Sequence, residues 1–352
     1  MRKVGLRLQA CLVFVLAGQS SIIVVCRVTE SAARSDPSTT VGKSRVLAVF
    51  VTYNPDNAVL AENIKSVLDQ GCDCYVVDNA SAFPLALKPN PERVTVDLQA
   101  TNLGLGSAQN IGLRAAQNGN YDYAILFDQD SLPDSNMIES LLRAHKKKSQ
   151  SAKVAAVGPV YRNAQNGTES FFVRFGYLKF KRAYKAEADE HGCIEADFLI
   201  SSGSLCRVEA LNHIGLMDES LFIDHVDTEW FLRSRALGYQ SFGVADAMMG
   251  HELGEDTHQV SLGGRKRNVP QHKPFRYYYI FRNSVLLYKR RGTSWLWKWN
   301  DLQRLVLIAV MFGVFKAPRL SNLSMMLKGA WHGIIGRSGK LVEYAVASDK
   351  AK

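Results

Sequence analysis

The 352-residue chain has few cysteines and lacks the cysteine patterns of metal clips and disulfide scaffolds. Its six cysteines form no CxxC pair and no dense framework. Zinc clips and small secreted domains need closely and regularly spaced cysteines, so both classes are disfavoured. We expect reduced cysteines and a cytoplasmic protein.

Two ligand-binding signatures are also absent. The segment GLGSAQ, which starts at Gly104, has Gln109 where the dinucleotide-binding fingerprint requires a third glycine, and it follows a third predicted strand rather than the first. This argues against a dehydrogenase. No recognised nucleic-acid motif accompanies the basic residues, so no nucleic-acid partner is expected.

Acidic residues are scarce near the end of the chain. Residues 265–352 hold 18 Lys and Arg against 3 Asp and Glu, whereas the whole chain has a formal net charge of +10. The preceding part is therefore slightly acidic. A basic arm of this kind favours an anionic partner, and we expect peripheral attachment at the inner face of the cell membrane.

The segment 293–320 explains this charge asymmetry best. Arg304 and Lys316 bracket 11 uncharged residues, which is too few to cross a bilayer, since a spanning helix needs about 20. We predict an amphipathic interfacial helix with tryptophans at headgroup depth. Packing of this helix against the main domain is the alternative. The helical spacing is carried by Trp295, Trp299, Leu302, Val306, Ala309 and Gly313.

Residues 1–43 stand apart from the rest of the chain. Residues 8–26 carry no charge and follow Arg2, Lys3 and Arg7, as in a signal or anchor segment. Polar residues interrupt this run, and no clear cleavage site follows. A membrane anchor, a signal peptide and an upstream extension from a wrongly chosen start codon are all consistent with it; we favour the extension.

From Arg45 onward, short apolar strands alternate with amphipathic helices. This order predicts a mostly parallel sheet covered by helices on both faces. In such sheets, ligands bind at the carboxyl ends of the strands. The predicted strands are 45–53, 74–81, 93–100 and 123–130, and the predicted helices are 57–69, 106–119, 135–146 and 227–237.

The fourth strand ends in two carboxylates, Asp128 and Asp130, with one residue between them. At this spacing, where a strand gives way to a turn, both can point toward one divalent cation, and hard oxygen ligands suit Mg²⁺ or Mn²⁺. The alternative is a capped turn that starts the next helix.

Several blocks in order resemble the inverting family-two glycosyltransferases of the GT-A fold. They begin with VTYN, VDNAS, TNLGLGSAQNIG and FDQDS, and the later blocks narrow the resemblance to the rhamnosyltransferase branch. It covers about residues 45–335. The later blocks are ISSGSLCR, LFIDHVDTEW, GHELG and RYYYIFRN.

The resemblance implies an α/β fold, a Rossmann-like nucleotide-diphospho-sugar transferase, with C-terminal amphipathic helices. It implies transfer of L-rhamnose from dTDP-β-L-rhamnose, with inversion, to a lipid-linked precursor of a surface polysaccharide such as O-antigen. Asp128, Asp130 and His251 would hold Mg²⁺ or Mn²⁺; a buried histidine bonded to backbone is the alternative for His251. Asp227 would be the general base, with Asp224 as its rival. Asp227 and Glu229 could instead only supply negative charge to the first turn of a helix.

The remaining expected contacts fall to three groups of residues. The strand ends supply the donor contacts, although each such residue could merely end a strand. Two arginines follow a Gly-rich basic stretch that could be a mobile lid. These arginines would bind diphosphate. Alternatively, the neighbouring aromatic residues pack on the sheet and the arginine side chains extend to water. Expected at the donor are Tyr53, Asn54, Asp78, Asn79, Asn102, Gly104, Asn110, Asp128, Arg276 and Arg282; expected at the acceptor are Ser202, Gly203 and Glu229.

Four parts of the chain are expected. They are an N-terminal extension (1–43), a catalytic domain (44–262), a basic lid with the RYYYIFRN block (263–292) and a membrane-associating region (293–352). Two alternative functions stay open: transfer from a different nucleotide sugar, and an inactive membrane-bound scaffold. The joint presence of Asp128, Asp130, Asp227 and His251 argues against the scaffold.

Overall fold

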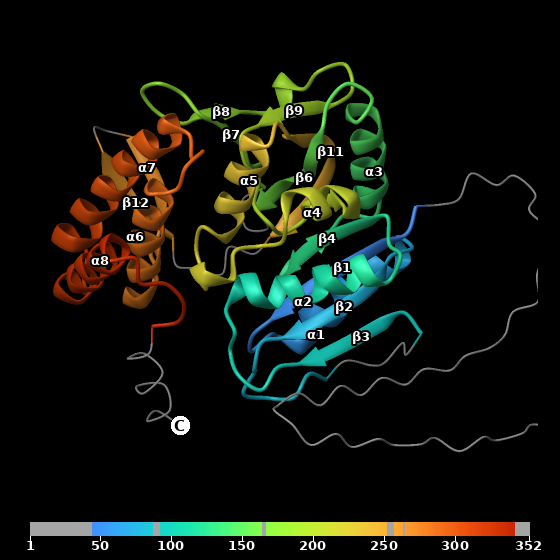
Figure 1. Ribbon diagram of the computed structural model, residues 1–352, viewed down its shortest axis with the longest axis horizontal. Helices are drawn as coiled ribbons and strands as arrows, with labels where there is room; N and C mark the ends of the chain where they lie inside the picture. The colour runs from blue at the N-terminus through green and yellow to red at the C-terminus, as the bar shows by residue number, and fades with distance from the viewer. Residues whose placement is uncertain (1–43, 87–91, 164–166, 252–256, 263–264, 342–352) are drawn as a thin grey trace, which may run out of the picture.

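The computed structural model describes residues 44–86, 92–163, 167–251, 257–262 and 265–341, with backbone alone for 251, 257–262 and 265–270. The expectations for residues 1–43 therefore lie outside the described residues. The described chain is an α/β structure built on a nine-stranded sheet, with α6, α7 and α8 gathered to one side of it (Figure 1).

The first half of the sheet is parallel, as predicted. Strands lie in the order β3-β2-β1-β4; α1 connects β1 to β2, and α2 connects β3 to β4. The elements are β1 (Val46–Thr52), α1 (Asn57–Asp69), β2 (Asp73–Asp78), β3 (Val94–Leu98), α2 (Leu105–Asn118) and β4 (Tyr123–Asp128). The predicted range of α1 matches its bounds, and the other predicted ranges differ from these bounds by at most three residues at either end.

The second half contains antiparallel strands that the sequence did not reveal. The order continues β4-β10-β6-β11-β5, and β10 runs antiparallel to both of its neighbours. Three strands of this half, β5, β9 and β10, have only three or four residues, which is too few for a periodic pattern to reveal them. The elements are β5 (Ser131–Pro133), α3 (Met137–Lys148), β6 (Val154–Asn163), β7 (Phe172–Arg174), β8 (Lys181–Ala183), β9 (Cys193–Ala196), β10 (Leu205–Arg207), α4 (Val208–Ile214), α5 (Val226–Ala236) and β11 (Gln240–His251).

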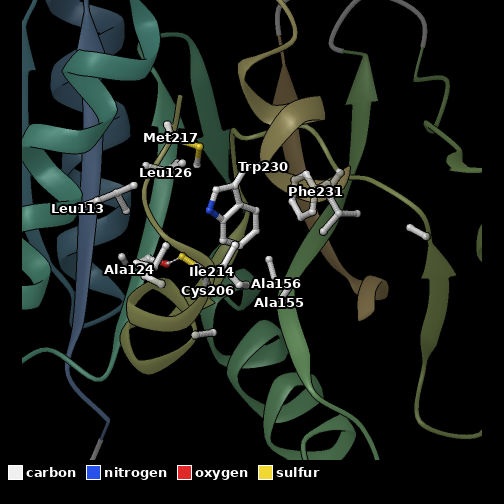
Figure 2. Packing of buried hydrophobic residues seen from close by; sticks show 14 of the residues in the cluster. Leu113, Ala124, Leu126, Ala155, Ala156, Cys206, Ile214, Met217, Trp230 and Phe231 are labelled. Atoms are coloured by element: carbon white, nitrogen blue, oxygen red, sulfur yellow. Dashed lines mark hydrogen bonds between the residues drawn. The ribbon is translucent and has the colours of Figure 1, made fainter. Parts of the chain in front are cut away.

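Both faces of the sheet are buried. Alternate residues of β1 enter different clusters: Leu47 and Val49 pack with α2, α4 and α5, whereas Val46, Ala48 and Phe50 pack with α1 and α3. Figure 2 shows the indole of Trp230, from α5, packed among residues of the first cluster. This two-sided burial explains why the strands read as continuous apolar runs.

The C-terminal region is more divided than predicted. The single helix expected over 293–320 is wrong: α7 (Trp295–Ile308) runs into a π-helical turn (Ala309–Phe315), and α8 (Arg319–Ile334) begins separately after Pro318. Proline disfavours the helical conformation of the residue before it and lacks the N–H that would continue the helix. Before these helices come a hairpin, β12 (Thr257–Leu262) with β13 (Arg265–Pro270), and α6 (Pro274–Tyr288).

No helix in the described part of the chain has both the length and the apolar character needed to cross a membrane. Much of the stretch expected to be a lid lies in β13, and residues 263–264 lie outside the described residues.

Candidate active site

The carboxyl ends of β1, β2 and β4 meet at one edge of the sheet. Thr52 pairs with Asp78, and Val51 with Asp128. Side chains then join the loops that follow: Gln129 Oε1 accepts a hydrogen bond from the Tyr53 amide at 2.8 Å, and Ser81 Oγ accepts one from the Asn54 amide at 2.8 Å. The predicted gathering of the strand ends is thus confirmed.

Asp78 is buried in a compact turn. Its carboxylate accepts hydrogen bonds from Thr52 Oγ1 at 2.9 Å and from Ser81 Oγ and N at 2.5 and 3.0 Å. Asn54, with φ of 49°, accepts from the Ala82 amide at 2.7 Å. These bonds fix the shape of the loop beside Tyr53, whose ring is half exposed. Direct contact of Asp78, Asn54 and Tyr53 with a sugar-nucleotide donor stays a prediction.

A second group of predicted donor residues braces the wall around α2. Asn79 donates to Asn102 Oδ1 at 3.3 Å and accepts from the Leu103 amide at 2.8 Å. Asn110 bonds both the amide and the carbonyl of Met217, at 2.8 and 2.9 Å. Because the Asn110 side chain is buried and hydrogen-bonded to the Met217 backbone, we do not include it among the proposed donor contacts.

Gly104 is required at the start of α2. Its φ is +88°, and a Cβ there would lie 2.6 Å from the Phe222 carbonyl oxygen. This close approach ties the wall of the donor side to the loop before α5, since the Leu105 amide donates to the same Phe222 oxygen at 2.6 Å.

Asp128 and Asp130 flank the turn between β4 and β5, and both are partly buried. Ser202 supports this turn: its Oγ accepts from the Asp128 amide at 3.0 Å and bonds Ser131 Oγ at 2.9 Å. The backbone of His251 pairs with Ser131, so that residue stands beside the acidic turn; its side chain lies outside the described residues.

The described side chains supply only part of a complete set of metal ligands around the acidic turn. No cluster of three His, Cys, Asp or Glu side chains occurs within the described ranges. Asp128 and Asp130 offer hard carboxylate oxygens suited to Mg²⁺ or Mn²⁺. Two carboxylates of the turn therefore suit such an ion as ligands. His251 is a further candidate ligand, because its backbone pairs with Ser131, the residue after Asp130.

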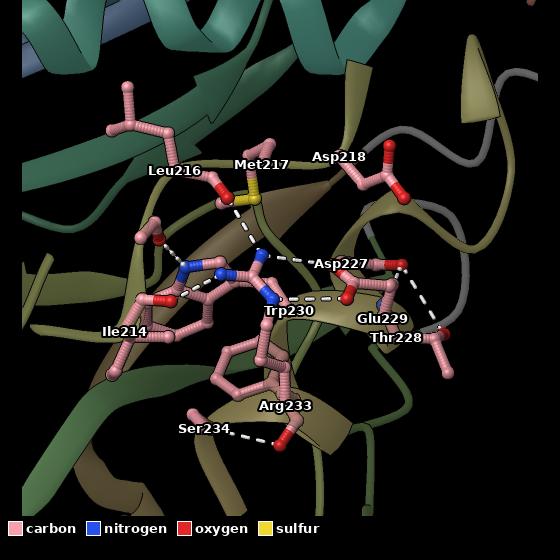
Figure 3. A network of polar contacts seen from close by, with 12 residues as sticks. Ile214, Leu216, Met217, Asp218, Asp227, Thr228, Glu229, Trp230, Arg233 and Ser234 are labelled. Carbon is pink, nitrogen blue, oxygen red and sulfur yellow. Dashed lines mark hydrogen bonds and ion pairs between the residues drawn. The ribbon is translucent and has the colours of Figure 1, made fainter. Parts of the chain in front are cut away.

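Asp227 lies in the first turn of α5, partly buried, and accepts from the Thr228 amide at 2.7 Å (Figure 3). Burial raises the pKa of its carboxyl, and the nearby charge of Asp224 raises it further, while hydrogen bonds from the Thr228 and Ser201 backbones oppose both effects. A carboxylate with a raised pKa holds a transferred proton better, as a general base must.

Ser201 and Ser202 connect Asp128 and Asp227. Ser202 Oγ accepts a hydrogen bond from the Asp128 amide at 3.0 Å, and the Ser201 backbone bonds the Asp227 carboxylate. The part-buried Tyr161 hydroxyl donates to the Ser202 carbonyl at 2.5 Å. Burial raises the pKa of Tyr161 well above its usual value, and the nearby charges of Asp128 and Asp227 raise it further. The two carboxylates, which come from distant parts of the chain, are thus joined through residues 201 and 202.

Asp224, the rival base, is already paired. Arg276 contacts both of its carboxylate oxygens, through Nη2 at 2.7 Å and Nε at 3.4 Å. This two-point contact engages both Asp224 oxygens, so they are less accessible to an acceptor hydroxyl. Arg276 thus braces the site, and its predicted contact with diphosphate stays a prediction.

The end of the RYYYIFRN block has a role that the sequence did not reveal. Asn283 Nδ2 donates to the carbonyls of Leu221, Ile223 and Asp224 at 3.0, 2.8 and 2.9 Å. Arg282, fully buried, donates to the Leu221 carbonyl at 2.8 Å. Because its guanidinium is taken up by backbone carbonyls, Arg282 is not carried into the donor site. No spacing in the sequence marks such side chain to backbone contacts.

The Glu229 side chain is likewise buried and engaged by internal ion pairs. It is 4% exposed, and Arg233 contacts both of its oxygens at 3.0 and 2.9 Å (Figure 3). Arg290 Nη1 lies 2.9 Å from Glu229 Oε1, and this ion pair joins α5 to the end of α6. The acceptor contact predicted for Glu229 therefore has no support in this geometry.

Ser202 and Gly203 lie where the acceptor was expected, next to Asp128. The Gly203 amide donates to the Leu126 carbonyl at 2.6 Å, and its φ of +70° with Pro159 Cγ 2.6 Å from a Cβ position demands glycine. Contact with an acceptor stays a prediction for both residues.

A mostly parallel sheet with polar strand ends, an acidic turn after β4 and a partly buried carboxylate at the start of α5 are together typical of a sugar-nucleotide transferase of the GT-A type. The profile described as "Glycosyl transferase family 2" matches residues 48–215. The dTDP-rhamnosyl transferase RfbF of Shigella flexneri is 34% identical over 261 residues, covering 70% of this chain and 81% of that protein. Galactofuranosyltransferase GlfT1 of Mycobacterium tuberculosis is 25% identical, covering 75% and 90%.

Two solved structures share the fold. The crystal structure of GalNAc-T7 with UDP, GalNAc and Mn²⁺ has a TM-score of 0.52 at 14% identity, covering 88% of this chain and 58% of that one. Residues 1–349 of S. aureus TarS give a TM-score of 0.51 at 12% identity, covering 82% and 81%. The chain belongs to the family-two glycosyltransferases. The predicted fold, family and enzyme class are confirmed, and the Shigella relative supports the rhamnosyltransferase branch.

Proposed function

We propose that this enzyme transfers L-rhamnose from dTDP-β-L-rhamnose to a hydroxyl of a lipid-linked glycan precursor, with inversion at the anomeric carbon. The donor assignment is supported by the relative at 34% identity. The chemistry is supported chiefly by one observation: the adjacent residues Ser201 and Ser202 bond the Asp227 carboxylate and the Asp128 amide, so a base candidate is linked to the acidic turn.

Asp227 is the proposed general base. It removes the proton from the acceptor hydroxyl as the oxygen attacks the sugar from the face opposite the leaving group. Asp224 is less suited as the base, because its carboxylate forms an ion pair with Arg276, whose Nη2 lies 2.7 Å from Oδ1. The bonds from Thr228 and Ser201 hold the Asp227 carboxylate in place, and its raised pKa favours acceptance of the proton.

Asp128, Asp130 and His251 are the proposed residues for Mg²⁺ or Mn²⁺. When bound, a divalent cation neutralises the charge that develops on the departing nucleotide diphosphate. Ser202 keeps Asp128 in position through the 3.0 Å bond to its amide. Tyr53, Asn54, Asp78, Asn79, Asn102 and Gly104 form the proposed donor wall, and Arg276 supports the site from the α6 side.

Attachment to the membrane is part of this proposal. The acceptor class is lipid-linked, and α7 leaves Trp295 and Trp299 exposed by 62 and 47%. Indole rings favour the headgroup region of a bilayer. We place the enzyme on the cytoplasmic face of the membrane.

A panel of nucleotide sugars tests the donor. The purified full chain is expected to hydrolyse or transfer only dTDP-rhamnose among dTDP-, UDP- and GDP-sugars when Mn²⁺ or Mg²⁺ is supplied. Asp227→Asn should lower turnover by about 10²–10⁴-fold and leave donor binding intact. Asp69→Asn, which removes an exposed carboxylate paired with Lys65, is the matched control. Preference for another sugar, or near-normal turnover of Asp227→Asn, contradicts the proposal.

A further inference from the structure

Helix α7 has two different faces. One face is buried and includes Trp297, Asp301 and Leu305, which are 2, 1 and 5% exposed. The other carries an apolar stripe at helical spacing that the described chain leaves about half exposed, with the Tyr177 ring 6.1 Å from that of Trp295. The stripe consists of Trp295, Trp299, Leu302 and Val306, exposed by 62, 47, 45 and 57%.

The charge around this stripe is of one sign. Residues 271–341 contain 13 Lys and Arg and a single acidic residue, Asp301. That carboxylate is buried and lies 2.7 Å from Arg304 Nη2, so it offers nothing to the surface. An exposed apolar stripe with tryptophans, in a segment whose surface charges are cationic, is complementary to an anionic lipid surface.

The inner face of α7 contacts the loop that carries the catalytic helix. Arg304 Nη2 donates to His225 Nε2 at 3.0 Å, and Ser284 Oγ lies 3.0 Å from the same nitrogen. The His225 ring stands edge-on to Trp297, with centroids 5.8 Å apart. His225 is the N-cap of α5, two residues before Asp227.

This loop is held in an unfavourable backbone conformation. Phe222, Asp224 and His225 have φ values of 66, 61 and 61°, which non-glycine residues rarely adopt. Such a loop persists only where its surroundings over-determine it. Asn283 and Arg276 hold it from α6, and from α7 Arg304 reaches it through a hydrogen bond, beside the ring contact of Trp297.

We propose that Arg304 is a positioning residue that links the lipid-facing helix α7 to the loop 222–225. When the stripe seats on an anionic bilayer, α7 is fixed, and through Arg304 and His225 the first turn of α5 is fixed with it. Asp227 is then held where the acceptor hydroxyl arrives. The inference rests on the proposed function, and it makes turnover depend on the membrane that carries the lipid-linked acceptor.

The test compares turnover with and without vesicles, using the full chain and a water-soluble glycan acceptor. Phosphatidylcholine vesicles with phosphatidylglycerol are expected to raise kcat about fivefold or more, with KM for the donor little changed. Vesicles of phosphatidylcholine alone should have little effect. Binding of anionic vesicles with no change in kcat would overturn the proposal.

Variants separate docking from coupling. Arg304→Gln is expected to bind vesicles and lose the stimulation, and Arg304→Lys to recover part of it. Lys298→Gln removes the same charge from the same helix and should weaken vesicle binding yet keep full stimulation at saturating lipid. Stimulation of Arg304→Gln equal to that of the wild type would overturn the proposal.

A readout without catalysis distinguishes this inference from the proposed function. Amide hydrogen exchange over residues 222–230 of the wild-type chain should slow when anionic vesicles bind. Unchanged exchange there overturns the coupling even if Arg304→Gln fails to fold. Absence of any rhamnosyl transfer together with slowed exchange would overturn the donor assignment and leave the coupling intact.

Discussion

Asn283 donates its side-chain amide to the backbone carbonyl of Asp224 at 2.9 Å. The same nitrogen lies 3.0 and 2.8 Å from the carbonyls of Leu221 and Ile223. One buried amide therefore fixes the strained loop that leads into α5. The catalytic arrangement depends on this contact between α6 and the loop.

Removal of this clamp should damage catalysis more than folding. Asn283→Ala leaves buried carbonyls without donors, which costs about 1–3 kcal/mol of unfolding free energy. A displaced Asp227 should lower kcat by about 100-fold. Asn322→Ala is the matched control, because Asn322 is also buried and donates to the Phe312 carbonyl at 3.0 Å. Denaturant unfolding and steady-state kinetics measure both effects; equal losses of kcat in the two variants would contradict the clamp.

The pH dependence of transfer should report Asp227. It acts only as a carboxylate, so kcat/KM should rise with pH through its pKa and fall on the acidic side. Burial places this pKa above 3.8, and the charge of Asp224 raises it further. Asp224→Asn should therefore move the acidic inflection to lower pH. An inflection that stays in place in Asp224→Asn argues against Asp227 as the titrating group.

Stability should fall between about pH 6.5 and pH 4. Burial is the main cause that lowers the pKa of His225 and of His145 from 6.5 to about 4. In this range the unfolded rings bind protons that the folded rings do not, so acid favours unfolding by up to about 1.4 kcal/mol per pH unit for each ring. Urea unfolding at several pH values measures the slope. His225→Asn should reduce it, and an unchanged slope contradicts this account.

Activity should depend on a divalent cation. Treatment with EDTA is expected to abolish transfer, and Mn²⁺ or Mg²⁺ should restore it. Asp130→Asn should weaken Mn²⁺ binding in calorimetry, because one of the two carboxylates of the turn loses its charge. Full transfer in the presence of EDTA would show that Asp128 and Asp130 serve another purpose.

The sequence by itself determined the parallel half of the sheet and its polar edge. Alternating strands and helices placed β1, β2 and β4 within a few residues, because buried parallel strands require apolar runs that end in polar turns. The ordered polar blocks identified the family. Local spacing also singled out Asp128 and Asp130 at the end of a strand, whereas Asp227 was singled out by the resemblance to the family.

Only the tertiary structure decided which of the polar residues remain open to a ligand. Arg282, Glu229 and Asn110 resemble binding residues in the sequence, yet each is spent on a buried carbonyl or ion pair. Such contacts join residues far apart in the chain, and their partners are mostly backbone atoms that every residue carries. For the same reason no pattern marked Asn283 or the Arg304 contact with His225.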